Sequence, residues 1–283
     1  MDLVDYLTDS LDLSEVDALA GGHQSRVFRA VRRDGACVAV KSIDASLVDR
    51  DELEVRLGVV NALADLDPRV CRPVLLAEDF VIDFAMSGGQ DRFIVGYEYA
   101  FGEEPDPTRA SDAARMGAAL SDLHESMRML PTVTLPVVGA LRSASTDGAH
   151  AISASQLLHG DFSASNLRQT GEEVRIFDFD DCGYGPPEFD VANALYMVLF
   201  DQTRRGSLHT YETFRQSFID GYLNSSGPSI RADSLDRFID LRVHALALWL
   251  DDLDNAPIGI REAPSAWHTT LRSFVSSYRS STA

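Results

Sequence analysis

The chain has 283 residues, of which 45% are hydrophobic and 24% charged, the composition of an ordinary globular protein. Its 44 acidic and 25 basic residues give a net charge of −19, which argues against unaided binding to nucleic acid or to anionic membranes. No apolar run reaches the roughly 18 residues of a membrane span, and the N-terminus lacks the basic region of a signal peptide. The three cysteines show no C-x-x-C spacing and favour reduced thiols, so we expect a cytoplasmic protein. The expected oligomeric state is a monomer or a homodimer.

The first hundred residues predict a small lobe with a five-stranded antiparallel sheet. A short helix is expected up to about Leu11, and apolar spacing predicts a second helix over residues 47–66. Strand-like segments lie on either side of this second helix, and an Asp34-Gly35 turn joins two of them. The strands are predicted at residues 14–20, 25–31, 36–41, 74–84 and 92–100.

Residues 101–108 are acidic, contain two prolines and are predicted to be a linker. The chain beyond them is mainly helical in pattern, with one short strand at residues 174–179. Helices are predicted at about 187–202, 207–223, 233–253 and 261–279. The order predicts an α+β protein with two lobes, residues 1–100 and 101–283, and a crevice between them.

The strongest motif is H-G-D-F-S-A-S-N, from His159 to Asn166, followed twelve residues later by Asp178 at the end of the predicted strand. Transfer of a phosphoryl group from a nucleotide requires such residues. One carboxylate would accept or orient the attacking hydroxyl, while an amide and a second carboxylate supply the hard oxygen ligands that magnesium prefers. Asp and Asn also commonly hydrogen-bond the backbone of a loop, so this motif alone leaves both readings open.

Lys41 ends the apolar strand segment V-A-V-K and is the only lysine among the 25 basic residues. Lysine and arginine differ in shape, hydration and reach, so they do not replace each other at a phosphate. A chain that uses arginine everywhere else indicates a site here that requires a compact ammonium. The alternative is a lysine that stands there by accident of composition.

Two weaker features surround Lys41. The segment from Gly21 and Gly22 to Ser25 is a glycine-containing turn whose backbone N–H groups are expected to approach phosphate oxygens. Glu54 on the following helix is the candidate partner that holds Lys41, and Glu52 is its rival. Most Gly-Gly pairs are only turns and most helical glutamates are solvated, so neither feature is specific alone.

The order of these features matches the layout of kinases: glycine turn, lysine strand, glutamate helix, hinge, H-G-D-x-x-x-x-N, then Asp on a strand. It departs from protein kinases, because H-G-D replaces H-R-D, D-F-D-D replaces D-F-G, and no A-P-E is found. Together with M-G-A-A-L-S-D-L-H-E and P-P-E-F-D-V-A-N, these motifs resemble the aminoglycoside phosphotransferase family. That kinase-like group also includes choline, homoserine and antibiotic kinases.

The resemblance implies a protein-kinase-like fold, with a nucleotide-binding lobe followed by a helical lobe that carries the catalytic loop and the substrate site. It implies ATP or GTP and Mg²⁺ as cofactors. Asp161 resembles the catalytic base, and His159 and Asp190 resemble residues that support its loop. Asn166 and Asp178 resemble the magnesium ligands.

For the nucleotide, the resemblance makes Lys41, paired with Glu54, the ligand of the α- and β-phosphates. Gly21, Gly22 and Ser25 would lie over the phosphates. The hinge at the end of the last strand would meet the base through backbone groups. Its residues are Glu98, Tyr99 and Ala100.

Acidic residues of the helical lobe are candidates for an amine-bearing substrate. A cluster stands near the end of a predicted apolar helix, and further carboxylates are scattered elsewhere. The candidates are Asp180, Glu188, Asp251, Asp252, Asp254 and Glu262, and the sequence does not decide the roles of Asp180 and Asp181. The alternative for the cluster is a helix end that faces water.

The leading hypothesis is a small-molecule kinase that inactivates a polar or cationic antibiotic by phosphorylating a hydroxyl. The alternatives are a Ser/Thr protein kinase of the same fold, since D-F-D-D-x-x-x-G-P resembles a branch with such an enzyme, and a choline- or homoserine-type metabolite kinase. A binding module without activity is a further reading, disfavoured because every catalytic position is filled. The expected partner is a small molecule, not nucleic acid or a membrane.

Overall fold

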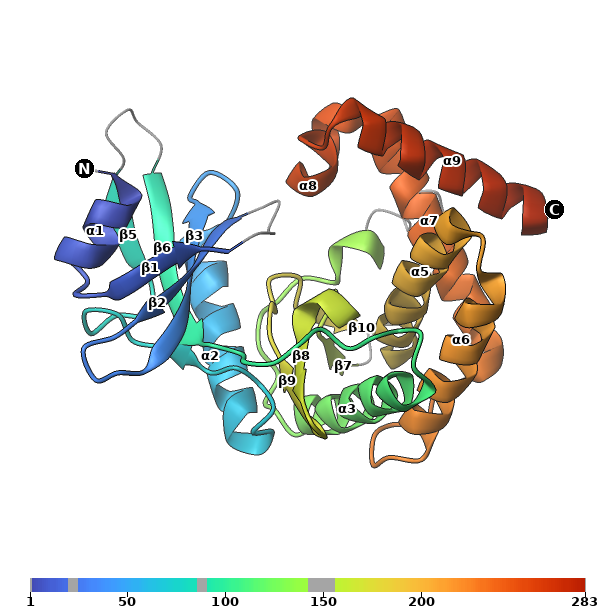
Figure 1. Ribbon diagram of the computed structural model, residues 1–283, viewed down its shortest axis with the longest axis horizontal. Helices are drawn as coiled ribbons and strands as arrows, with labels where there is room; N and C mark the ends of the chain where they lie inside the picture. Colours follow the sequence, from blue (N-terminus) through green and yellow to red (C-terminus); the bar gives the residue numbers. More distant parts are fainter. Residues whose placement is uncertain (1, 20–24, 86–90, 142–155, 283) are drawn as a thin grey trace. The chain divides into compact units, whose positions relative to one another are not determined.

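The structure is a computed structural model that describes residues 2–19, 25–85, 91–141 and 156–282 (Figure 1). It separates into two compact units, residues 1–101 and 102–283, which are described in turn. The first unit is an antiparallel sheet with two helices and the second is mainly helical, which confirms the predicted α+β fold class. Within the described ranges, none of the helices has the length and apolar character needed to cross a membrane.

Six strands form the sheet of the first unit, in the order β1-β2-β3-β6-β4 with β5 also paired to β6. Every pairing is antiparallel. The strands are β1 (Ser14–Ala18), β2 (Ser25–Val31), β3 (Cys37–Asp44), β4 (Pro73–Val74), β5 (Ile82–Ala85) and β6 (Asp91–Glu98).

Alternation along the strands gives this sheet two buried faces, each covered by one helix (Figure 1). Helix α1 (Leu3–Asp9) packs Leu3 and Leu7 on the face that carries Val38 and Val40 of β3. Helix α2 (Arg50–Leu66) covers the opposite face and is capped by Asp49, whose side chain accepts a hydrogen bond from the N–H of Glu52. Side chains of β3 therefore point alternately towards α1 and towards α2.

The single strand predicted over residues 74–84 is wrong, because two short strands, β4 and β5, take its place. Both pair with β6 along the same edge: Val74 lies opposite Gly96, and Ile82 lies opposite Ile94. The intervening residues leave the sheet through a tight turn in which Ala77 and Glu78 have positive φ values of 48° and 76°. The sheet has five strand positions, as predicted, but two segments share the outer one.

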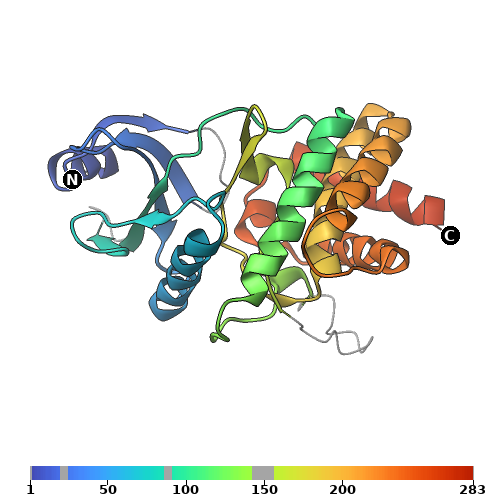
Figure 2. The ribbon, with the colours of Figure 1, turned by 90° about the horizontal axis from the view of Figure 1, so that it is seen from below.

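Helices make up most of the second unit, close to the predicted ranges. They are α3 (Ala110–Arg128), α5 (Pro187–Arg205), α6 (Leu208–Leu223), α7 (Leu235–Asp251), α8 (Ile258–Arg261) and α9 (Ser265–Thr282). Figure 2 shows α3 and α6 side by side, and glycines allow them to approach closely. A Cβ on Gly117 of α3 would lie 2.0 Å from the carbonyl oxygen of Phe218, and one on Gly221 of α6 would lie 2.1 Å from that of Ala114.

Two small antiparallel sheets in the second unit frame the motif around Asp161, and of their four strands only β9 was predicted. Strand β7 (Gln156–Leu158) pairs with β10 (Gly183–Gly185), and β8 (Leu167–Thr170) pairs with β9 (Glu173–Ile176). A 3-10 turn, η1 (Ala164–Asn166), precedes β8. The strand predicted at 174–179 stops at Ile176, before the positive φ of 68° at Asp178.

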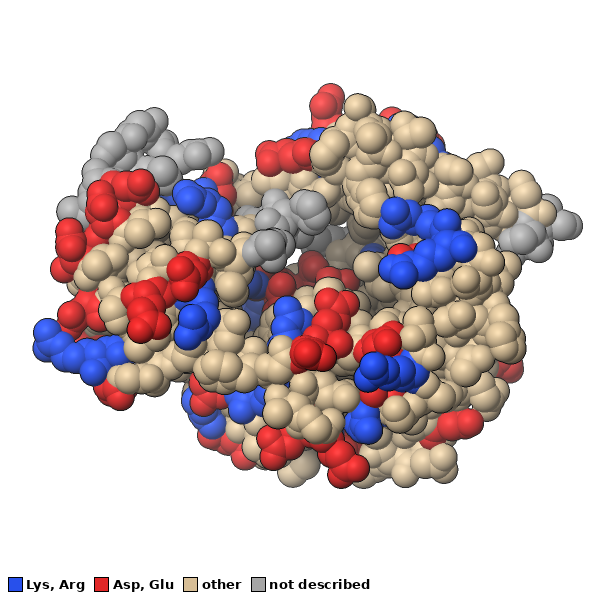
Figure 3. All heavy atoms as spheres, viewed as in Figure 1, with Lys and Arg blue, Asp and Glu red and all other residues tan. Residues whose placement is uncertain are grey.

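Acidic and basic side chains are interspersed on the face drawn in Figure 3. Many of them form exposed ion pairs between neighbouring positions, such as Arg205 with Asp201 at 2.8 Å and Arg128 with Glu125 at 2.9 Å. Exposed pairs of this kind contribute about 0–1 kcal/mol each to stability. The surplus of acid therefore does not gather into one docking surface on that face.

Candidate active site

The H-G-D motif forms a loop between β7 and the turn η1, and a buried carboxylate holds its start. Asp190, in the first turn of α5, is fully buried. One of its oxygens accepts a hydrogen bond from the N–H of His159 at 2.8 Å, and the other accepts one from the N–H of Gly160 at 2.9 Å. Charge-assisted bonds of this kind are stronger than neutral ones, so the two N–H groups fix the loop backbone relative to α5.

Gly160 is required at the second position of the motif. Its φ is +87°, a region that side chains rarely adopt, and an added Cβ would lie 2.1 Å from the carbonyl oxygen of Asp181. The backbone therefore turns sharply between His159 and Asp161 and packs directly on the segment that follows β9. Any other residue here would displace Asp161.

The hydrogen bonds of His159 define its tautomer. The N–H of Asp161 donates to Nδ1 at 3.3 Å, which makes Nδ1 an acceptor. Nε2 then carries the proton and donates to the carbonyl oxygen of Phe177 at 3.0 Å. His159 is fully buried as a neutral group that ties the H-G-D loop to the end of β9.

A second buried histidine, His124, supports the carboxylate of Asp190. His124 of α3 lies 3.1 Å from an oxygen of Asp190 through Nε2 and 2.7 Å from the hydroxyl of Tyr222 through Nδ1. Burial raises the pKa of Tyr222, and the charges of Asp190 and Glu188 raise it further, so this phenol stays protonated and donates to His124. Tyr222 thus donates to His124, and His124 bonds Asp190, which also accepts from the two loop N–H groups. These three side chains come from three helices.

Two amides hold the carboxylate of Asp161 from opposite sides. The Nδ2 of Asn166 donates to one carboxylate oxygen at 3.3 Å and to the Asp161 carbonyl at 2.8 Å. The Nδ2 of Asn193, on α5, donates to the other carboxylate oxygen at 3.2 Å and to the carbonyl of Phe162 at 3.2 Å. Asp161 remains partly exposed, so its carboxylate is oriented and still accessible.

The β8–β9 hairpin brings Asn166 and Asp178 together. Leu167 pairs with Ile176 in the first register position, and the N–H of Phe177 donates to the carbonyl of Asn166 at 3.1 Å. Asp178 is the next residue, so an amide and a carboxylate stand at the same end of the hairpin. Because Nδ2 of Asn166 is engaged by Asp161, its amide oxygen is the group left to meet a cation.

This donor pair fits magnesium bound with the help of a nucleotide. Magnesium typically takes one or two protein ligands and completes its shell with water and phosphate oxygens. Among the described residues, no group of three or more His, Cys, Asp or Glu is arranged to hold a metal by itself. An Asn–Asp pair agrees with a metal that enters together with phosphates.

Asp181 lies among further carboxylates. Burial and the carboxylates of Asp161, Asp180 and Asp178 together raise the pKa of Asp181 to about 6, and Arg242 opposes them. Part of the Asp181 side chain is also in contact with solvent. The loop is strongly negative, as a cation-binding site must be.

Lys41 lies on the α2 side of the sheet in the first unit. It is buried, with 8% of its surface exposed, and it stands opposite Val95 of β6 and Val27 of β2. The two glutamates proposed as its partners bond arginines of their own helix: Glu54 accepts from Arg50 at 2.8 Å. The pairing of Lys41 with Glu54 stays a prediction.

Glu52, the rival partner, accepts a hydrogen bond from Arg56 at 2.5 Å. Its side chain is 38% exposed and that of Glu54 is 50% exposed, so Glu52 is the more buried of the two. Ser25 begins β2 opposite Ile43 of β3. Gly21 and Gly22 lie outside the described residues.

The proposed hinge follows the end of β6. Glu98 is its last residue, and its N–H donates to the carbonyl of Arg72 at 2.8 Å. The N–H of Tyr99 donates to the carbonyl of Cys37 at 3.3 Å. Ala100 follows outside any strand, so the backbone here leaves the sheet within three residues.

The substrate candidates of the second unit come from several elements. Asp251 ends α7, Asp252 caps it, and Asp254 lies in the short turn η3 (Leu253–Asn255), so the predicted helix end at 253 is two residues too long. All three are exposed. Glu188 accepts from the N–H of Arg231 at 3.2 Å. Glu262 lies 4.0 Å from Arg261, while Asp180 is partly buried beside Asp181.

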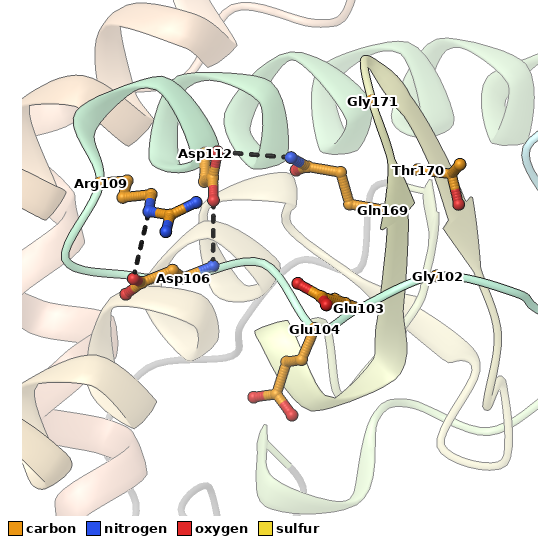
Figure 4. A pocket seen from close by; sticks show the side chains of 9 residues that line it. All are labelled: Gly102, Glu103, Glu104, Asp106, Arg109, Asp112, Gln169, Thr170 and Gly171. Atoms are coloured by element: carbon orange, nitrogen blue, oxygen red, sulfur yellow. Dashed lines mark hydrogen bonds and ion pairs between the residues drawn. The ribbon is translucent and has the colours of Figure 1, made fainter.

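A separate cleft of about 520 Å³ lies at the far end of the β8–β9 hairpin from Asn166 (Figure 4). The segment after the first unit crosses it, and Glu103 and Gln169 exchange two backbone hydrogen bonds of 3.1 and 2.8 Å. Buried Asp112 accepts from the N–H of Asp106 at 3.2 Å and from Arg115 at 2.7 Å. The carboxylate of Asp112 thus holds the predicted linker in place, and it already has hydrogen-bond partners within the protein.

Sequence reasoning missed four residues of this site: His124, Tyr222, Asn193 and Arg242. Asn193 was within reach, because it follows Asp190 by three positions on one helix and so faces the same side. His124 lies in the motif M-G-A-A-L-S-D-L-H-E, which carried the resemblance without giving it a role. Tyr222 and Arg242 have no sequence signal of this kind, since their positions depend on how α6 and α7 pack.

Comparison with known proteins confirms the resemblance. The family model described as Phosphotransferase enzyme family (APH) matches residues 140–232, which include the H-G-D motif, Asn166, Asp178 and Asp190. No curated protein sequence matches the chain significantly.

Solved structures extend the likeness to the whole fold. An amicoumacin kinase in complex with AMP-PNP, Ca²⁺ and Ami is 18% identical, with 97% of this chain and 93% of that chain covered and a TM-score of 0.75. A microcompartment-associated aminopropanol kinase is 18% identical, covering 97% and 94%, with a TM-score of 0.71. Spectinomycin phosphotransferase in complex with ADP and spectinomycin is 13% identical, covering 96% and 97%, with a TM-score of 0.56. The chain has the fold of kinase-like phosphotransferases.

Proposed function

We propose that the chain is a kinase that transfers the γ-phosphoryl group of ATP or GTP to a hydroxyl of a polar small molecule. The observation that carries this proposal is the oriented Asp161 carboxylate, bonded by Asn166 and Asn193, with Asp178 at the same end of the adjoining hairpin. Phosphoryl transfer depends on positioning and on charge stabilisation, and these residue types supply both.

In this proposal Asp161 accepts a hydrogen bond from the acceptor hydroxyl and orients its oxygen. The oxygen forms a bond to the γ-phosphorus, the bond from that phosphorus to the β-bridging oxygen breaks, and the nucleoside diphosphate leaves. The hydroxyl proton passes to the Asp161 carboxylate. Asn166 and Asn193 keep the carboxylate in place, and His159 and Asp190 keep the loop in place.

Asn166 and Asp178 would hold Mg²⁺ through oxygen atoms. When bound, the metal neutralises charge on the nucleotide phosphates. Lys41 would bind the α- and β-phosphates, for which its compact ammonium is suited. Backbone groups of Glu98, Tyr99 and Ala100 would meet the base, and Gly21, Gly22 and Ser25 would lie over the phosphates.

We infer that the acceptor is a polar alcohol that bears an amine. The solved relatives include kinases of antibiotics and of aminopropanol, and a strongly acidic chain attracts cations. Antibiotic inactivation is the leading use, and a metabolite amino alcohol is the alternative. A protein acceptor is disfavoured because the chain lacks the A-P-E motif.

A nucleotide-consumption screen tests this function. The protein is incubated with Mg-ATP or Mg-GTP and a panel of antibiotics, choline, amino alcohols and Ser/Thr peptides, and the phosphorylated atom of any product is located by NMR. We expect consumption only with small-molecule alcohols. Transfer confined to peptides would replace the proposal with a protein kinase, and failure to bind any Mg-nucleotide would refute it.

A further inference from the structure

The guanidinium of Arg242, on α7, lies close to three aromatic rings. Its guanidinium carbon lies 5.1 Å from the ring centre of Tyr196, 5.9 Å from that of Phe189 and 6.0 Å from that of Trp249. These distances are within the range of cation–π contacts. The rings restrict the guanidinium from several sides.

The helix α5 relates this guanidinium to Asp161. Phe189, Asn193 and Tyr196 are spaced four and three residues apart, so they lie along one face of α5. Asn193, the middle member, donates to the Asp161 carboxylate at 3.2 Å. Because Arg242 contacts the residues on either side of Asn193, its side chain lies over the same stretch of helix that orients Asp161.

Electrostatics agree with this placement. Burial raises the pKa of Tyr196, while Arg242 lowers it and Asp161 raises it, so one phenol lies within reach of both charges. Arg242 likewise lowers the pKa of Asp181 while Asp161 raises it. The cation and the carboxylates therefore share one small region.

Arg242 retains hydrogen-bonding capacity. Its Nε is buried and has no hydrogen-bond partner in the part of the chain that the structure describes. The Arg242 side chain as a whole is partly exposed. A buried donor without a partner is destabilising, so an acceptor oxygen supplied by a ligand would stabilise this arrangement.

We propose that Arg242 binds an oxyanion, a carboxylate or a phosphate, in the acceptor site beside Asp161. A guanidinium is always charged, weakly hydrated and shaped to meet two oxygens at once, which suits it to these groups. The inference rests on the proposed function and sharpens it: the acceptor carries a hydroxyl for Asp161 and an anionic group for Arg242. An anionic acceptor would otherwise be repelled by the neighbouring carboxylates.

A second arginine of the same unit provides a matched control. Arg204, near the end of α5, lies 5.4 Å from the ring centre of Phe200 and 5.1 Å from that of Trp267. It is eleven residues beyond Asn193, which places it about 16 Å further along the helix. The chain has only two tryptophans, so each arginine has its own fluorescent neighbour.

The test is an anion titration followed by tryptophan fluorescence at constant ionic strength, without nucleotide. In a Trp267→Phe variant only Trp249 emits, and sodium phosphate and sodium acetate are the probes. We expect a saturable change with a Kd of about 1–10 mM, the affinity of a single weak anion contact. Arg242→Met should weaken binding at least about tenfold, the equivalent of about 1.4 kcal/mol, and Arg204→Met should not change it.

Two further variants separate binding from folding. Arg242→Lys keeps the charge and should restore part of the affinity, which a purely structural arginine would not do. In a Trp249→Phe variant, Trp267 should show no saturable change. Equal binding by the wild type and by Arg242→Met, or no saturable change up to about 100 mM anion, would overturn the proposal, because even a millimolar site would be visible there.

The source of the oxyanion is decided by repeating the titration with saturating Mg-AMP-PNP. Continued binding assigns the site to an anionic group of the acceptor, and exclusion assigns it to the transferred phosphoryl group. The turnover screen should include pairs that differ only in a carboxylate, such as L-threonine and 1-aminopropan-2-ol. If the enzyme turns over a carboxylated acceptor and Arg242→Met leaves the KM of that acceptor unchanged, this inference alone is refuted. If the protein binds anions and turns over no acceptor, the proposed function alone is refuted.

Discussion

Two groups of carboxylates in the second unit, at the catalytic loop and at the end of α7, look alike in sequence and differ in structure. Around the loop, Asp190 accepts two backbone N–H groups and Asp161 is held by two amides. At the end of α7, Asp251 faces solvent with a 3.4 Å contact to Arg272, and Asp252 accepts from Asn255 at 2.9 Å. Fixed donors from several elements thus distinguish a carboxylate that is positioned for chemistry from one that is solvated.

The position along the helix strengthens this contrast. Asp190 lies in the first turn of α5, where the helix dipole favours negative charge, whereas Asp251 lies at the last turn of α7, where it does not. The helix dipole therefore stabilises the negative charge of Asp190 and does not stabilise that of Asp251. We therefore expect substitutions in the two groups to have very different consequences.

The largest effect is expected from Asp178→Ala. Because Asp178 and Asn166 share one end of the hairpin and are proposed to hold the metal, the variant should lose Mg-dependent turnover. Metal titration of the nucleotide complex, followed by calorimetry, is the measurement. A titration identical to that of the wild type would place the metal elsewhere.

Lys41→Arg tests the first unit. It keeps the charge but replaces a compact ammonium by a larger planar group, so kcat/KM for the nucleotide should fall about 10²-fold, the loss typical of removing one donor to a developing charge. Unfolding by urea should be unchanged. Since Lys41 is the only lysine, an amine-reactive ATP analogue should label it, and excess Mg-nucleotide should protect it. Normal kinetics together with labelling only at the N-terminal amine would make this lysine an accident of composition.

Asp190→Ala should destabilise the second unit. It leaves two loop N–H groups and His124 without their acceptor, and each buried group without a partner costs about 1–3 kcal/mol, so we expect the free energy of unfolding to fall by about 3 kcal/mol or more. Chemical denaturation is the measurement. Asp201→Ala on the same helix is the control, because its exposed pair with Arg205 contributes less than about 1 kcal/mol. Equal losses in both variants would remove the special role of Asp190.

The smallest effect is expected at the end of α7. Asp251→Asn, Asp252→Asn and Asp254→Asn should each change stability by less than about 0.5 kcal/mol, as surface substitutions usually do. Their KM for a turned-over acceptor is the decisive readout. An increase in KM without a change in kcat would indicate that these three residues bind the acceptor. The difference drawn here between them and the carboxylates of the catalytic loop would then be wrong.

The sequence singled out Asp161, Asn166 and Asp178, because the spacing of the motif and the chemistry of its side chains are local properties; the structure brings these residues together, and their roles stay predictions. It predicted the helices of the second unit to within a few residues, because apolar periodicity reports which face is buried. It missed β7 and β10, which pair over a long separation with three residues each, since such short strands have no periodicity of their own. It also merged β4 and β5, because the apolar run 74–84 hides a turn.

The residues that surround Asp161 were harder to predict than Asp161 itself. Arg242 reaches the site only because α5 and α7 pack against each other, and that contact is not written in the residues near Arg242. Asn193 could have been inferred from its spacing to Asp190. Partners across helices are a property of packing, so they require a structure.

Single-turnover transfer from nucleotide to acceptor in Asp161→Asn tests the central claim most directly. The substitution preserves the shape of the side chain and removes the carboxylate that would take the hydroxyl proton. We predict that the transfer rate falls by about 10²–10⁴-fold, the range for loss of a general base, while the nucleotide Kd stays within twofold or so of the wild type. A transfer rate close to that of the wild type would contradict the assignment of Asp161 and, with it, the proposed mechanism.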